Sequence, residues 1–180
     1  MKNPILVISL AILLGFAFGC QNKAEKAELE KFRAQAKVEE QNKELVRNFF
    51  SAIDKSDFAK IQELSAAEFG FRAPGLPGPI AVEGIIQAIK VHYTAFPDWK
   101  HTVEDLVADG DKVAVRLAQT GTHKAEYEGI PATGKDISMP AICLLVIANG
   151  KVKEVWAVEN YWDFYQQLGM ELKPKEAEKK

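Results

Sequence analysis

Residues 152–160, near the C-terminal end of the chain, combine apolar and polar side chains in an alternating order. We expect a strand here, in which successive side chains point to opposite faces. One face would then carry Glu154 and Asn160 beside Trp156 and Val158. A carboxylate and an amide set into an apolar wall are typical of a small-molecule pocket. The alternative is an edge strand with one solvated face.

Glu154 is the candidate acid–base group of this face, because a carboxylate takes up and returns protons. The side chain of Asn160 does not titrate, but its NH₂ group can donate a hydrogen bond to a carbonyl oxygen or an enolate. Glu159 would point to the opposite face of a regular strand. A one-residue bulge would exchange the two faces.

Three further residues are candidates for the same pocket. His123, at the end of another expected strand, is a candidate general base or orienting group, and a structural or exposed histidine is the alternative. Arg116 lies in an apolar strand, where an ion pair is the alternative to substrate binding, and Tyr93 lies on the apolar face of an expected helix. The three histidines of the chain have no ordered spacing to one another or to carboxylates. No metal site is therefore expected from these residues.

The composition bounds the class of protein. The chain has 180 residues and a net charge of −2, with no basic stripe, so no nucleic-acid partner is expected. The only cysteines are Cys20 and Cys143, which argues against a disulfide framework. Without its two unusual ends the chain keeps about 130 residues, enough for one domain with a core.

The N-terminal end has the pattern of an export signal. Lys2 precedes an uninterrupted apolar run over residues 5–18. This run is shorter than the roughly 20 residues of a membrane-spanning helix and suits the apolar region of a signal peptide. The small residues before Cys20 resemble the processing site of bacterial lipoproteins. The resemblance implies a lipoprotein signal peptide over residues 1–19, a lipidated Cys20, and a protein exported and anchored at the membrane of the cell envelope. An ordinary secretory signal or a retained helix are the alternatives.

The segments that flank the domain are charged. Residues 20–42 consist mainly of Ala, Glu, Lys, Gln and Leu, which are good helix formers. We expect a partly helical, solvated tether there. Residues 171–180 are also highly charged and are expected to form a disordered tail.

The first half of the remaining domain, which spans residues 43–170, is expected to be helical. Apolar side chains three and four residues apart predict helices over residues 44–54, from Phe58 onward, and over residues 83–96. Residues 71–80 are dense in Pro and Gly and must form a loop. This loop is either a cover over a cavity mouth or a connector.

The second half is expected to form strands joined by hairpins. The strands are predicted at residues 100–108, 112–122, 136–147 and 152–160. The strand at 136–147 is almost continuously apolar, which predicts burial of both faces. Helices followed by such strands indicate an α+β fold. We expect N-terminal helices packed into a strongly curved antiparallel sheet, a cone-shaped domain with an internal pocket.

Six segments together resemble the SnoaL-like polyketide cyclase family, which has the nuclear-transport-factor-2-like cone fold. They are FPDW at 96–99, VEDLVADGDKVAVR at 103–116, GTH at 121–123, GIPATGK at 129–135, GKVKEVWAVEN at 150–160 and QQLG at 166–169. The resemblance implies an intramolecular aldol ring closure of a polyketide ester, without metal or cofactor, and a homodimer by analogy. A pocket aspartate commonly acts as acid and base in this family, four residues after the tryptophan, where this chain has Asn160.

Two functions follow from these residues, and the sequence leaves open whether the protein is an enzyme. Because Asn160 replaces the family aspartate and the chain is expected to be exported, we favour a lipid-anchored, extracytoplasmic domain that binds a small apolar or carbonyl-containing ligand without catalysis. The alternative is a cofactor-independent cyclase, isomerase or hydrolase of a polyketide-like or ester carbonyl compound, with Glu154 and His123 as titrating groups. A purely structural spacer is a third alternative.

Overall fold

The computed structural model of the chain describes residues 4–171 and 173, and their side chains from Lys23 onward. The chain divides into two compact units between Val38 and Glu39. The elements are α1 (Pro4–Asp54), α2 (Phe58–Leu64), β1 (Ser65–Arg72), α3 (Val82–Ala95), β2 (Lys100–Asp109), β3 (Lys112–Thr122), β4 (Asp136–Ala148), β5 (Lys151–Glu159) and α4 (Tyr161–Gln167).

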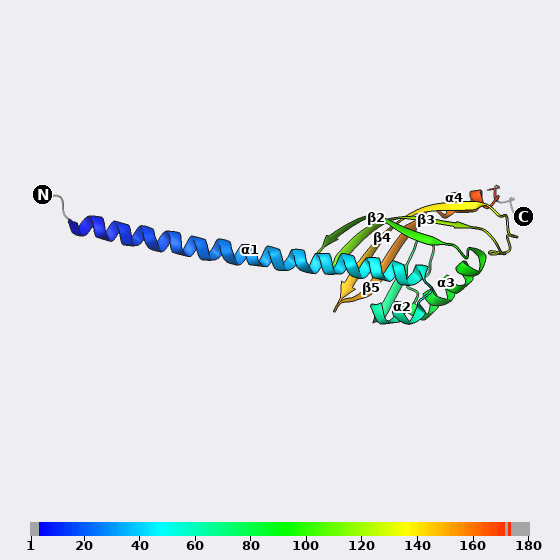
Figure 1. The fold of residues 1–180 in the computed structure, drawn as a ribbon, viewed down its shortest axis with the longest axis horizontal. Coiled ribbons are helices and arrows are strands. Elements are labelled where there is room, and N and C mark those ends of the chain that lie inside the picture. The colour runs from blue at the N-terminus through cyan, green and yellow to red at the C-terminus, as the bar shows by residue number, and fades with distance from the viewer. Residues whose placement is uncertain (1–3, 172, 174–180) are drawn as a thin grey trace, which may run out of the picture. The chain divides into compact units, whose positions relative to one another are not determined.

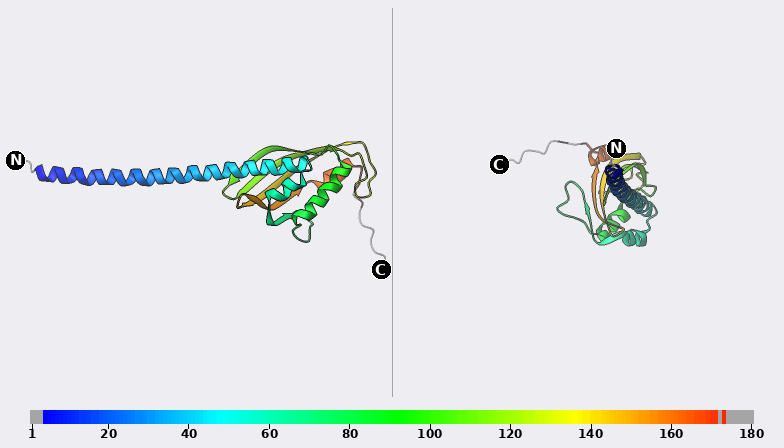
Figure 2. Two further views of the ribbon diagram at one scale, coloured as in Figure 1. Left: turned by 60° about the horizontal axis from the view of Figure 1, so that its bottom comes forward. Right: turned by 90° about the vertical axis from the view of Figure 1, so that its left-hand side faces the viewer.

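The strands form one five-stranded sheet in the order β1-β5-β4-β3-β2. Strands β2 to β5 are antiparallel neighbours, as the hairpin signals predicted, and β1 pairs in parallel with β5. Figures 1 and 2 show α2, α3 and the last turns of α1 on one side of the sheet, whose long strands bend over them. The predicted α+β fold with helices packed into a curved sheet is confirmed.

The core lies between these helices and one face of the sheet. Val113, Val115 and Leu117 of β3 are at most 1 % exposed, whereas the residues between them face outward. They pack with Val46 of α1 and Ile61 of α2, both fully buried. The apolar side chains that alternate along the strand therefore pack in one layer with those spaced three and four residues apart on the helices.

The expectation that β4 is buried on both faces is wrong. Cys143 and Leu145 are buried, but their neighbours Ile142 and Leu144 are 59 % and 40 % exposed. The reason is that the helices cover only one face of the sheet, so the alternate residues of β4 remain on the outer face. The homodimer expected by analogy stays a prediction, and nothing in the structure of the single chain tests it.

Strand β5 contains a bulge that breaks its alternation. Val152 is paired with Ile147 of β4, but the next pair along the ladder joins Glu154 to Val146. Lys153 is therefore one residue in excess on β5. Such a bulge moves all later side chains of a strand to the opposite face.

The hairpins are placed by their turn residues. Asn149 and Gly150, between β4 and β5, have φ angles of +52° and +71°. Two positive φ angles in succession are the geometry that Asn-Gly favours in a two-residue hairpin, as expected from the sequence. Strand β1 was not predicted, because its residues Ser65–Arg72 include two alanines and a glycine and carry little strand propensity.

The N-terminal predictions fall largely outside what the structure describes. Residues 1–3 and the side chains before Lys23 are not described, so the expected signal peptide over residues 1–19 and the lipid attachment at Cys20 stay predictions. Residues 20–42 are helical throughout, as part of α1, rather than partly helical. Within the described residues, no helix has the length and apolar character needed to cross a membrane. Most of the expected C-terminal tail, residues 172 and 174–180, is also outside the described residues.

The two faces of β4 predict a contrast between adjacent leucines. Leu145 is fully buried at the centre of the core, so Leu145→Ala should lower the free energy of unfolding by about 2–5 kcal/mol. Leu144→Ala, on the outer face, should lower it by about 1 kcal/mol or less. Equilibrium unfolding in urea measures both. Equal losses would contradict the assignment of the two faces.

Candidate functional site

A cavity of about 510 Å³ lies between the helices and the inner face of the sheet. Its lining is mainly apolar and includes Phe50 of α1, Ile89 of α3 and Val155 of β5. Pro74 and Leu76 show that the loop after β1 is part of the cavity wall and not only a connector. Size and lining are those of a site for a small organic molecule.

The cavity wall contains the carboxylate of Glu159, which the bulge in β5 turns inward. Gln119 Nε2 donates a hydrogen bond of 2.9 Å to Glu159 Oε1. The amide of Gln119 is itself oriented by Trp99, whose Nε1 donates to Gln119 Oε1 at 3.3 Å. Gln119 is only 3 % exposed. The carboxylate therefore has a fixed partner on a buried strand.

The negative charge of Glu159 acts on the neighbouring groups of the cavity. Desolvation and then the charges of Glu128 and Glu159 raise the pKa of Tyr127 to about 12. Desolvation and the charge of Glu159 likewise raise the pKa of the Cys143 thiol to about 12. Both groups stay protonated at neutral pH. Glu128 and Glu159 are the carboxylates of this lining, and Glu159 is the one that the buried amide of Gln119 holds.

A second polar group of the cavity is formed by His101 of β2 with Asp54 and Tyr93. Asp54 Oδ1 lies 2.6 Å from His101 Nδ1 and accepts the backbone N–H of His101 at 3.0 Å. The Tyr93 hydroxyl donates to the same oxygen at 3.4 Å. His101 and Tyr93 line the cavity. Desolvation, followed by the charge of Asp54 and its hydrogen bond, raises the pKa of Tyr93.

His92 of α3 contributes an imidazole among aromatic rings. Its ring centre lies 4.7 Å from that of Phe96, 4.5 Å from that of Trp99 and 5.5 Å from that of Tyr127. Its Nε2 is buried and has no hydrogen-bond partner among the described residues. Desolvation, together with the charge of His101, lowers the pKa of His92 to about 4. The ring is therefore neutral at pH 7.

The expected pocket face of β5 is wrong. Glu154, Trp156 and Val158 lie on the outer face of the sheet, where Trp156 is 47 % and Val158 59 % exposed. The Trp156 indole N–H donates to Glu154, and Arg72 Nε lies 3.4 Å from the same carboxylate. The cause is the bulge at Lys153, which places these side chains away from the cavity.

Two other candidates lie outside the cavity wall, and one lies within it. Asn160 caps α4, with its Oδ1 accepting the backbone N–H of Asp163 at 3.2 Å. Arg116 is exposed on the outer face and pairs with Glu104. Tyr93 lines the cavity. Whether any candidate acts in catalysis stays a prediction.

His123 is fully buried but is not part of the cavity lining. Its ring stacks on Phe96 at 5.0 Å, and its Nδ1 accepts the backbone N–H of Thr133 at 3.3 Å. Its backbone N–H donates to the carbonyl of Lys135 at 2.9 Å. These contacts fasten the loop between β3 and β4, so the structural alternative fits His123 better than a general base.

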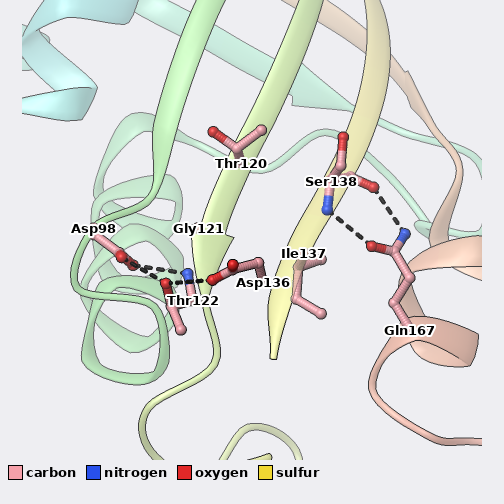
Figure 3. Close-up of a pocket in the computed structure, with 8 residues that line it drawn as sticks. All are labelled: Asp98, Thr120, Gly121, Thr122, Asp136, Ile137, Ser138 and Gln167. Atoms are coloured by element: carbon pink, nitrogen blue, oxygen red, sulfur yellow. Dashed lines mark hydrogen bonds between the residues drawn. The ribbon is translucent and has the colours of Figure 1, made fainter. Parts of the chain in front are cut away.

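A second, polar hollow lies where β3, β4 and α4 meet, and Figure 3 shows its lining. The hydroxyl of Thr122 donates to Asp98 at 2.7 Å, and its backbone N–H donates at 2.8 Å. These bonds lower the pKa of Asp98 to about 2. The side chain of Gln167 bonds to both backbone groups of Ser138. These polar groups bind one another, so their hydrogen bonds hold the ends of β3 and β4 in place and leave few groups for a ligand.

The candidate residues that the sequence-based prediction missed are Asp54, His101, Gln119 and the inward position of Glu159. The sequence did contain a signal for Gln119. This polar residue lies two positions after Leu117, so the alternation of β3 predicts that it faces inward. No local signal joins Asp54 to His101, which lie 47 residues apart. In the part of the chain that the structure describes, no three His, Cys, Asp or Glu side chains are grouped as a metal site would require.

Comparison with known proteins identifies the fold family. The model of the SnoaL-like polyketide cyclase family matches residues 43–168. The chain belongs to the SnoaL-like polyketide cyclase family. The aklanonic acid methyl ester cyclase DnrD of Streptomyces peucetius is 30 % identical over 117 residues, which are 64 % of this chain and 78 % of the relative.

Solved structures agree with this membership. IdmH of Streptomyces antibioticus has a TM-score of 0.67 and 29 % identity, over 72 % of this chain and 99 % of IdmH. AclR of Streptomyces galilaeus has a TM-score of 0.67 and 25 % identity, over 73 % and 97 % of the two chains. A SnoaL-like protein of Agrobacterium tumefaciens, at 19 % identity and a TM-score of 0.59 over 71 % and 98 %, shares the fold.

The lowered pKa of His92 predicts a loss of stability in acid. The unfolded chain binds a proton at this residue near pH 6.5, whereas the folded SnoaL-like domain binds it only near pH 4. The free energy of unfolding should therefore fall as the pH decreases from about 6.5 to about 4. His92→Phe should reduce this fall, as measured by urea unfolding across the pH range. Parallel curves for the two proteins would contradict the prediction. Losses linked to Asp98 follow as the pH falls from 3.8, the ordinary value of an aspartate, to its pKa of about 2 in the folded protein.

Proposed function

We propose that this SnoaL-like domain is a cofactor-independent acid–base catalyst, a cyclase or isomerase, that acts on a small, largely apolar carbonyl compound. The observation that carries the proposal is Glu159, a carboxylate held by Gln119 in the wall of an apolar cavity. A carboxylate beside a bound carbonyl compound can remove a proton from the adjacent carbon and return it.

The relatives support a ring closure as the reaction. The matched family is named for polyketide cyclases, and DnrD is an aklanonic acid methyl ester cyclase. In the corresponding step here, Glu159 takes a proton from the carbon next to one carbonyl group. The resulting enolate carbon forms a bond to a second carbonyl carbon of the same molecule. The proton on Glu159 then passes to the new alkoxide, so that no group leaves and the carboxylate is regenerated.

From the sequence, a function without catalysis was favoured because Asn160 stands where the family has an aspartate and because export is expected. In this chain Asn160 caps a helix, and Glu159, one residue earlier, places a carboxylate in the cavity wall. Binding without turnover remains the second candidate, because the lining of the cavity is mainly apolar.

Exchange of a carbon-bound proton tests the proposal without knowledge of the natural substrate. The probe is acetophenone in D₂O, whose methyl protons are followed by NMR in the presence of the full chain. The wild-type protein should accelerate deuterium uptake, and Glu159→Gln should reduce this acceleration by about 100-fold or more.

Glu154→Gln is the matched control, because it changes the same residue type in the same strand on the outer face. Its exchange rate should equal that of the wild type. Retained acceleration in Glu159→Gln would overturn the assigned role. Binding of acetophenone without any acceleration would favour the second candidate.

We further propose, from the sequence pattern alone, that the protein is exported and held at a membrane surface by acyl chains on Cys20. The apolar run over residues 5–18 and the small residues before Cys20 support this. Each buried CH₂ group of an acyl chain contributes about 0.8 kcal/mol to membrane binding.

In a bacterial host, Cys20→Ser should leave residues 1–19 attached and abolish acylation. Mass spectrometry of the N-terminal peptide measures both properties. An unmodified Cys20 in the mature wild-type protein would rule out the lipid anchor.

A further inference from the structure

The pair of Asp54 and His101 is an acid–base group at the cavity to which the proposed function gives no role. Asp54 is the last residue of α1, and His101 is the second residue of β2. One carboxylate oxygen of Asp54 lies 2.6 Å from His101 Nδ1 and 3.0 Å from its backbone nitrogen. Two contacts to one residue fix both the start of β2 and the plane of the ring.

The surroundings of the ring restrict it further. Phe50 packs against the imidazole with ring centres 5.6 Å apart. The side chain of His101 is 11 % exposed and that of Asp54 is 21 % exposed. The titratable groups that face the ring are Asp54 from α1 and Tyr93 and His92 from α3.

This arrangement assigns different tasks to the two ring nitrogens. A carboxylate accepts but does not donate, so the neutral ring carries its proton on Nδ1, toward Asp54. Nε2 is then the nitrogen available to the cavity that His101 lines. The same carboxylate can accept from Nδ1 when both ring nitrogens carry a proton, so Nε2 can act as an acceptor or as a donor.

The pair lies close to the site of the proposed function along the sheet. His101 is the direct cross-strand partner of Gln119, and Gln119 donates to Glu159. Two titratable groups thus line one cavity from β2 and β5, which β3 and β4 separate in the sheet, and Gln119 of β3 adjoins both. One of them can take a proton from a carbon atom of the ligand, and the other can donate a proton to an oxygen atom.

We propose that His101, oriented by Asp54, is a second acid–base residue of this cavity and acts on the carbonyl oxygen of the compound whose carbon atom Glu159 deprotonates. The inference rests on the proposed function. Glu159 takes the proton from carbon while protonated His101 gives its Nε2 proton to the oxygen, which forms an enol.

The cycle then balances. When the enol carbon attacks the second carbonyl, the enol oxygen returns its proton to His101, and Glu159 delivers its proton to the new alkoxide. The preferred ligand therefore has a carbonyl oxygen directed at β2 and the adjacent carbon directed at β5. Asp54 is a positioning residue in this scheme.

The first test does not depend on turnover. Long-range ¹H–¹⁵N NMR of the ¹⁵N-labelled full chain reports which nitrogen of each neutral histidine is protonated. The signals of His101 are those missing from the spectrum of His101→Gln. They should show the Nδ1–H form in the wild type. Asp54→Asn should give a mixture of the Nδ1–H and Nε2–H forms. Asp111→Asn, an exposed residue of the β2–β3 hairpin, should leave the Nδ1–H form unchanged. An Nε2–H form in the wild type would overturn the proposal.

The second test measures deuterium uptake of acetophenone as a function of pH. His101→Gln should lower the accelerated rate by about 100-fold and remove the decline of the rate at high pH, because the proton donor is gone. Asp54→Asn should shift that decline to lower pH, whereas loss of packing alone would lower the rate equally at every pH.

The outcomes separate the two proposals. If Glu159→Gln abolishes acceleration and His101→Gln does not, the role of His101 is wrong and the proposed function stands. If Glu159→Gln retains acceleration and His101→Gln abolishes it, His101 acts alone, which overturns both the proposed function and the shared mechanism inferred here.

Discussion

The extra residue in β5 is the constraint on which the candidate site depends. Up to Val152 the strand has one phase of alternation, and beyond Lys153 it has the other. The change of phase turns Glu159 toward the helices and Glu154 toward solvent. The ladders on both sides maintain it, since β5 pairs with β4 along one edge and with β1 along the other. Without the extra residue, the face of β5 that carries Trp156 would point toward the core.

The polar groups of the cavity are arranged in pairs that come from different elements. Trp99 orients Gln119, which holds Glu159, and Asp54 of α1 orients His101 of β2. An ionisable group in an apolar wall is stable only with such partners, because desolvation penalises unpaired charge. Each functional side chain is therefore positioned by tertiary contacts as well as by its own strand.

Family membership and site chemistry contribute separately to the function. The family match fixes the fold. The residues decide how this chain would act, because one fold supports many reactions. Asn160 illustrates the point, since it caps a helix here, whereas the neighbouring Glu159 lines the cavity.

The sequence by itself determined the helices over residues 44–54, from Phe58 onward and over residues 83–96, four of the five strands and the hairpin turns. Their signals are local, namely apolar spacing, Pro and Gly, and the Asn149-Gly150 pair. It also allowed for a bulge that would turn Glu159 inward, but gave no means to decide, because a bulge depends on pairing with β4 and β1. Only the tertiary structure decided which face of β5 is buried, that β1 forms, and that Asp54 meets His101. These are contacts between distant residues, which no local periodicity encodes.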